Sequence, residues 1–173
     1  MSLSYNMKGA AYGNASYFKP DAAYHTLKEL LGDELFIKTL QEYIKRWNGK
    51  HPMPYDFFNT FSEVTKQDLE WFWEPWFFDA GYPDLGIDTA YIKDGKVKVA
   101  VQQLGKIPTS VQVNFNFTDG SVKTQFKNCS VWRDNTDSVE WFEETIDGKK
   151  LKSVTLGNKY IPDIIKDNDV WEF

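Results

Sequence analysis

Residues 82–86, Tyr82-Pro83-Asp84-Leu85-Gly86, mark the point at which the hydrophobic pattern of the chain changes. Before this point, apolar residues recur at the three- and four-residue spacing of amphipathic helices. After it, they alternate with polar residues, as in half-buried strands. We therefore predict an α+β fold, with a helical domain over residues 1–85 and an immunoglobulin-like antiparallel β-sandwich over residues 86–173.

About four helices are predicted in the first domain. Pro20 suits the first turn of the first helix and Gly32 its end, after which Asp33 is expected to cap the second helix. The third helix is expected to begin at Pro54 and the fourth near Asp68. The apolar face of the second helix is predicted to contain Ile37, Leu40, Ile44 and Trp47. The fourth helix is apolar nearly all round, so we expect protein outside this chain to cover part of it.

Three Asp-Gly pairs divide the second domain into strands: Asp94-Gly95, Asp119-Gly120 and Asp147-Gly148. Asp-Gly favours tight turns because glycine accepts a positive φ. The first two pairs are predicted to close antiparallel hairpins. The third is predicted to continue the run of hairpins by joining strands over residues 139–145 and 151–156. About six or seven strands are expected in all, which suits a small sandwich.

The net charge excludes one class of function. The chain has 20 Lys and Arg residues against 25 Asp and Glu residues and shows no clustered basic face, so we expect no nucleic-acid partner. No apolar run reaches about 18 residues, so no membrane span is expected. The single cysteine, Cys129, excludes an intramolecular disulfide and leaves the cellular compartment open.

Few residues of the chain are suited to metal or nucleophilic chemistry. The two histidines, His25 and His51, lie 26 positions apart, and no His-Glu-x-x-His sequence is present, so a complete zinc site is not expected. We interpret His25 as a surface residue and His51 as a helix-cap or loop residue. Cys129 has no histidine near it in sequence, and no Gly-x-Ser-x-Gly elbow occurs. We therefore expect no catalysis by this chain alone.

Tyr17 is the candidate catalytic residue. It lies three positions before Pro20, at a predicted loop-to-helix junction, where a phenol can point into a cleft and donate a hydrogen bond to an oxyanion. The other interpretation is that Tyr17, like Tyr5, Tyr12 and Tyr24, packs against the helices or lies in a terminal tail. Residue type alone is compatible with both.

Five stretches of the first domain, taken together, resemble the end of the catalytic domain in aminopeptidase N-like gluzincin metallopeptidases. They are residues 17–20 (YFKP), 25–32 (HTLKELLG), 43–47 (YIKRW), 51–58 (HPMPYDFF) and 68–73 (DLEWFW). Residues 114–121 (NFNFTDGS) and 168–171 (NDVW) resemble the β-sandwich that follows the catalytic domain in many bacterial members. Two positions depart from the family pattern. Met53 stands where the family more often has Thr, and Thr65-Lys66 stands where Ser-Gly is usual.

The resemblance implies a peptidase whose active site extends beyond this chain. In the family, two His and one Glu hold the zinc cofactor, and the Glu of the His-Glu-x-x-His sequence acts as general base. The resemblance thus places the zinc and the remainder of the catalytic domain N-terminal to Met1, in a longer parent enzyme with a peptide substrate. Tyr17 matches the family tyrosine that donates a hydrogen bond to the oxyanion. Tyr5-Asn6-Met7-Lys8-Gly9 has one residue too many between Tyr and Lys to match that motif.

The alternative function is an interaction module in which exposed aromatic residues of the sandwich bind a peptide or a glycan. The candidates are Trp132, Trp141 and Trp171, because an exposed aromatic ring can stack on such ligands. Tryptophan in a strand more often lies in the core. A third interpretation makes the sandwich a scaffold that stabilises the catalytic domain.

Overall fold

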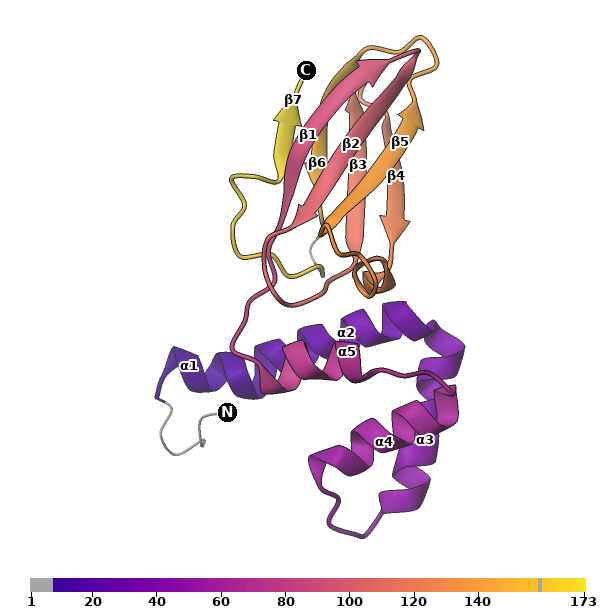
Figure 1. The fold of residues 1–173 in the computed structure, drawn as a ribbon, viewed down its shortest axis with the longest axis vertical. Helices are drawn as coiled ribbons and strands as arrows, with labels where there is room; N and C mark the ends of the chain where they lie inside the picture. The colour runs from indigo at the N-terminus through magenta and orange to yellow at the C-terminus, as the bar shows by residue number, and fades with distance from the viewer. Residues whose placement is uncertain (1–7, 159) are drawn as a thin grey trace. The chain divides into compact units, whose positions relative to one another are not determined.

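The computed structural model describes residues 8–158 and 160–173. The chain divides into two compact units, residues 1–80 and residues 81–173 (Figure 1). The sequence pattern placed the boundary between residues 85 and 86, whereas the division in the structure lies between Ala80 and Gly81.

The first unit is helical, as predicted. Its elements are α1 (Ala10–Gly13), η2 (Asn14–Phe18), α2 (Lys19–Leu31), α3 (Asp33–Trp47), α4 (Pro54–Thr65), α5 (Glu70–Trp73) and η3 (Glu74–Phe78) (Figure 1). The elements η2 and η3 are π-helical turns. The short elements α1 and η2 were not predicted, because Gly13 and Asn14 are poor helix formers. No helix in the described part of the chain has the length and apolar character to cross a membrane.

Gly32 joins α2 to α3. It has a φ of 77°, which residues with a Cβ rarely adopt, and its N–H donates to the Lys28 carbonyl at 2.8 Å. The Gly32 carbonyl accepts the Phe36 N–H at 3.0 Å, so Gly32 is the N-cap of α3. The prediction that Asp33 caps this helix is therefore wrong. The Asp33 carboxylate lies in the first helical turn, 3.3 Å from the Lys28 ammonium.

The buried face of α3 differs from the predicted one. Phe36 and Thr39 are buried, whereas Ile37 is 45% exposed and Ile44 is 54% exposed. The aromatic residues of α4 select this face, since the Phe36 ring lies 5.8 Å from the ring of the fully buried Phe61. The periodicity identified the helix correctly, but of the four predicted face residues Leu40 and Trp47 are half-buried, whereas Ile37 and Ile44 are exposed.

Aromatic rings form the core of the helical unit. The rings of Phe58 and Phe61 in α4 lie 4.7 and 5.9 Å from the ring of Trp73 in α5. All three side chains are buried, and burying a side chain of this kind contributes about 2–3 kcal/mol. The helix α4 begins where predicted, and the Asp56 carboxylate accepts the Met53 N–H at 2.7 Å. The cluster therefore holds α4 against α5.

The fourth predicted helix changes its hydrogen-bond pattern midway. It begins after Asp68, whose Oδ1 accepts the Glu70 N–H at 3.0 Å. Pro75 has no backbone N–H and cannot continue the α-helical pattern, and η3 forms around it. The turn ends where the Asp79 N–H donates to the Glu74 carbonyl at 3.0 Å. The predicted single helix is thus α5 followed by η3.

The second unit is a sandwich of two antiparallel sheets, so the predicted α+β class is confirmed (Figure 1). One sheet has the strand order β1-β2-β5 and the other the order β4-β3-β6-β7. The strands are β1 (Leu85–Lys93), β2 (Lys96–Gln103), β3 (Val111–Phe117), β4 (Val122–Lys127), β5 (Val139–Thr145), β6 (Leu151–Leu156) and β7 (Val170–Glu172), with a short 3-10 turn, η4 (Cys129–Trp132), between β4 and β5. The core contains alternate residues of β2 and β3, namely Val97, Val99, Val101, Val111, Val113, Phe115 and Phe117.

The three Asp-Gly pairs form turns, but only the first two close hairpins. Asp94 and Gly95 have φ of 52° and 72° between β1 and β2, and Gly120 has a φ of 84° between β3 and β4. Asp147 and Gly148, with φ of 47° and 73°, lead from β5 in one sheet to β6 in the other. The strand β5 pairs with β2, and β6 pairs with β3 and β7. The expected hairpin between β5 and β6 is therefore wrong.

The difference in burial between two neighbouring residues of α3 predicts a difference in stability. Phe36→Ala removes a buried ring next to Phe61 and is expected to lower the unfolding free energy of the helical unit by about 3–5 kcal/mol. Ile37→Ala, on the exposed face, is expected to cost less than about 1 kcal/mol. Chemical denaturation followed by far-UV circular dichroism measures both. Equal losses in the two variants would contradict the assigned face.

Candidate functional site

Tyr17 lies within a helical turn, so the predicted loop-to-helix junction is wrong. It belongs to η2, which runs directly into α2, and the Lys19 N–H donates to the Asn14 carbonyl with π-helical spacing. Tyr17 is 66% exposed, and the ring of Tyr12 lies edge-on to it at 6.4 Å. A helix therefore positions the phenol, and its ring is accessible to a partner or a substrate.

An apolar groove in the helical unit includes Tyr24 in its lining. Tyr24 follows Tyr17 by seven residues, across the change from the π-helical η2 to α2.

The groove has a volume of about 870 Å³ and is formed by α2, α3, α4, η3 and the segment before α4. Its lining residues are Tyr24, Phe36, Leu40, Tyr43, Pro52, Met53, Pro54, Tyr55, Phe57, Phe58, Phe77 and Phe78. The rings of Tyr55 and Phe78 stack at 5.7 Å, and those of Tyr43 and Phe57 meet edge-on at 5.0 Å. Such a surface favours apolar side chains and excludes water.

Sequence reasoning did not find this groove, because its lining comes from four helical elements and one connecting segment. The available signal was the excess of apolar residues in the fourth predicted helix.

Burial raises the pKa of the Tyr24 phenol in the groove, and neighbouring Tyr43 raises it further. The hydroxyl of Tyr24 is therefore protonated at neutral pH.

Lys19, two residues after Tyr17, connects the start of α2 with the end of η3. Its Nζ donates to the Asp79 carbonyl at 3.2 Å and to the Pro75 carbonyl at 3.5 Å. Burial lowers the pKa of Lys19, and the Asp79 carboxylate opposes this shift. Carbonyls at the end of a helix carry partial negative charge, so an ammonium group is favourable there. This contact holds in place the helix that carries Tyr17.

In the described ranges, no group of three His, Cys, Asp or Glu side chains is arranged to hold a metal ion. The Nε2 of His25 lies 3.8 Å from Asp21 Oδ1, one turn away on α2. His51 is exposed in the segment before α4. A zinc site needs three or four ligands that converge on one point, so the described side chains do not fit zinc.

The candidate residues of the sandwich are not brought together. Cys129 is fully buried, and Trp132 is buried with its Nε1–H donating to the Thr109 carbonyl at 2.8 Å. Trp141 is 49% exposed on β5, in one sheet, whereas Trp171 lies on β7 in the other sheet. The three tryptophans therefore do not form one aromatic platform.

A carboxyl cluster in the sandwich was not predicted. Asp84 and Asp169 are buried, and each has an Oδ1 for which the described residues offer no hydrogen-bond partner. The Oδ2 of Asp163 accepts the Leu85 N–H at 3.2 Å. Burial raises the pKa of Asp163 to about 6, and the nearby Asp169 carboxylate contributes to this shift. The Lys166 ammonium lies 3.1 Å from Asp169. Asp84 lies far in sequence from Asp163 and Asp169, so no local pattern predicts that the three belong to one cluster.

Comparison with known proteins finds similarity to a known family in the helical unit. Residues 4–76 match the model of the peptidase family M1 domain. Over 67 residues the chain is 33% identical to aminopeptidase N of Lactococcus lactis subsp. lactis. The aligned region covers 39% of this chain and 8% of that protein. The crystal structure of Legionella pneumophila aminopeptidase A in complex with aspartic acid is similar in fold, with a TM-score of 0.64 and 17% identity, over 85% of this chain and 17% of that chain.

These matches confirm the resemblance recognised in the sequence. Residues 4–76 are similar to a peptidase family M1 domain, and 67 residues of the chain are similar to part of an aminopeptidase N. The similarity to a solved structure covers most of the chain at the level of the fold. The chain spans only a small part of the length of the proteins that it matches.

The contact between Lys19 and the end of η3 predicts a loss of stability. Lys19→Met keeps most of the side-chain volume but removes both hydrogen bonds, so the unfolding free energy should fall by about 1 kcal/mol. Lys28→Met, which removes an exposed ion pair, is the control and should cost less than about 0.5 kcal/mol. Hydrogen exchange should also be faster at residues 74–79 in the Lys19 variant only. Unchanged exchange there would contradict the proposed connection.

The raised pKa of Asp163 predicts how stability depends on pH. A carboxyl with a folded pKa of about 6 and an ordinary value of 3.8 binds its proton more tightly in the folded state, so its contribution to stability is lost as pH rises through this range. Between pH 4 and pH 7.5, the unfolding free energy of the parent should fall by about 1 kcal/mol more than that of Asp163→Asn, after allowance for the partial exposure of Asp163. Denaturation curves at both pH values measure the difference, with Asp137→Asn as an exposed control. If the unfolding free energies of Asp163→Asn and the parent change equally between the two pH values, the raised pKa of Asp163 is refuted.

Proposed function

We propose that this chain is part of a zinc-dependent aminopeptidase-like enzyme, in which its helical unit forms one wall of the active-site cleft and supplies Tyr17. The match of residues 4–76 to the peptidase family M1 domain is the observation that carries the proposal. The exposure of Tyr17 and the presence of an apolar groove in the helical unit support it.

The proposed role of Tyr17 is to stabilise the oxyanion that forms when a peptide bond is attacked. A phenol is protonated at neutral pH and donates one hydrogen bond, which strengthens as negative charge develops on the former carbonyl oxygen. The location of Tyr17 on η2, and the contact of Lys19 with η3, favour a donor that needs little reorganisation. Both features favour stabilisation of the transition state over binding of the ground state.

The zinc and the general base of the proposed enzyme belong to another part of the protein. The described histidines and carboxylates of this chain do not fit a zinc site, so activation of water is not assigned to it. The chain corresponds to 8% of the related aminopeptidase N, which leaves room for such a part. We propose that the remainder of the catalytic domain packs against the apolar groove and that a peptide is the substrate.

We assign the sandwich a scaffold role in the proposed enzyme. Trp132, one candidate for binding a peptide or a glycan, is buried and has its indole N–H bonded to the Thr109 carbonyl. The alternative function as an interaction module therefore depends mainly on Trp141. The scaffold role requires no ligand, and the burial of Trp132 favours it.

Tyr17→Phe tests the catalytic assignment in a protein that joins this chain to the zinc-binding part of its domain. The variant keeps the ring and removes the donor, so kcat should fall by about 10²- to 10³-fold while KM changes little. Tyr12→Phe is the matched control, because this neighbouring ring is also partly exposed, and it should leave kcat near the parent value. Normal turnover by Tyr17→Phe would remove the assignment.

A further inference from the structure

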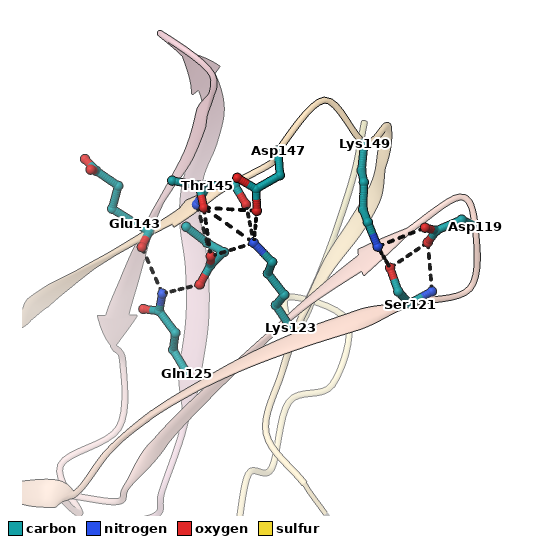
Figure 2. A network of polar contacts seen from close by, with 9 residues as sticks. Asp119, Ser121, Lys123, Gln125, Glu143, Thr145, Asp147 and Lys149 are labelled. Carbon is teal, nitrogen blue, oxygen red and sulfur yellow. Dashed lines mark hydrogen bonds and ion pairs between the residues drawn. The ribbon is translucent and has the colours of Figure 1, made fainter.

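The strand β5 is the end strand of its sheet, yet its outward backbone carbonyls are all engaged. The carbonyls of the alternate residues Val139, Trp141, Glu143 and Thr145 each accept a hydrogen bond from a side chain. The donors are Asn135 at 2.8 Å, Lys127 at 2.9 Å, Gln125 at 2.8 Å and Lys123 at 2.7 Å, in that order. Figure 2 shows the contacts of Gln125 with Glu143 and of Lys123 with Thr145.

Three of these donors come from alternate positions of one strand, β4, in the other sheet. Lys123, Gln125 and Lys127 are half-buried, while the residues between them are exposed. Lys123 donates to Thr145, the next donor, Gln125, to Glu143, and the last, Lys127, to Trp141. The donors and acceptors therefore follow one another in opposite directions along the chain, as in an antiparallel pair. Long polar side chains thus occupy the β5 carbonyls that would otherwise accept the backbone N–H groups of a neighbouring antiparallel strand.

Carboxylates hold the donors in this arrangement. The Lys123 ammonium lies 2.7 Å from Asp147 Oδ2 and 3.0 Å from Glu144 Oε1 (Figure 2). The Gln125 amide also donates to Glu144 at 2.8 Å, and Lys127 pairs with Glu140. Each of the three β4 side chains is therefore held by a carboxylate as well as by a β5 carbonyl.

An end strand with unsatisfied backbone groups pairs readily with another strand, and natural proteins suppress this with charged side chains, especially Lys. We propose that Lys123, Gln125, Lys127 and Asn135 form an edge guard that prevents β5 from accepting a further strand. The strand that β5 takes up when the guard is removed is β5 of a second copy of this chain.

The sequence of β5 favours a two-fold pairing centred on Trp141. In this register Trp141 lies opposite Trp141 of the second copy, Val139 opposite Glu143, and Glu140 opposite Phe142. No glutamate is directly opposite another, and two half-exposed indoles meet, which stabilises an antiparallel pair. Registers centred on Phe142 or Glu143 place glutamates directly opposite each other and are disfavoured.

Analytical ultracentrifugation of a triple variant, Lys123→Thr/Gln125→Thr/Lys127→Thr, tests the guard. Threonine is too short to reach the β5 carbonyls and is compatible with a strand. The association constant for dimerisation should be about tenfold or more above that of the parent chain. The control, Lys93→Thr/Lys152→Thr, removes the same charge from exposed positions of β1 and β6 and should behave like the parent.

Adding Trp141→Lys to the triple variant tests the register, because it places two positive charges opposite each other. It should return association to the parent level. If the triple variant does not fold, as judged by far-UV circular dichroism, the single variant Lys127→Thr replaces it, because Lys127 donates to the carbonyl of Trp141, the proposed centre. A folded variant that associates no more than the parent would overturn the guard, and association that Trp141→Lys leaves unchanged would overturn the pairing.

Discussion

Burial of aromatic rings is the interaction on which the helical unit depends. Phe58 and Phe61 of α4 pack against Trp73 of α5, and Phe61 also determines which side of α3 turns inward. The same rings that form this core continue outward into the groove, where Phe58 belongs to both. The core and the groove therefore share aromatic residues.

The helix that carries Tyr17 is held at its start by a polar contact. The element η3 ends at Phe78, so carbonyls of its last turn have no donor within the helix, and the Lys19 ammonium donates to the Pro75 and Asp79 carbonyls. Lys19 and Tyr17 belong to the same four-residue stretch of sequence. One residue of this stretch thus anchors the helix, while another presents a hydroxyl from it, which gives the proposed oxyanion donor a rigid support.

In the sandwich, an apparent irregularity of the sequence pattern has a structural explanation. A strand that faces a core normally has apolar residues on its inner side, yet β4 has Lys123, Gln125 and Lys127 there. These residues lie where the two sheets approach at one edge, so their inward direction leads to the backbone of β5 (Figure 2). The polar alternation joins the two sheets and occupies the acceptors of an end strand.

The sequence by itself determined the order and type of the main elements, the turn positions and the family resemblance that includes Tyr17. Each of these depends on residues close together in the chain, such as the spacing of apolar side chains or an Asp-Gly pair. Only the tertiary structure decided that Ile37 faces outward and that β5 and β6 lie in different sheets. It also assembled the groove and brought Asp163 close to Leu85. Such features depend on which distant segments pack together, and periodicity shows that a face is apolar without showing what covers it.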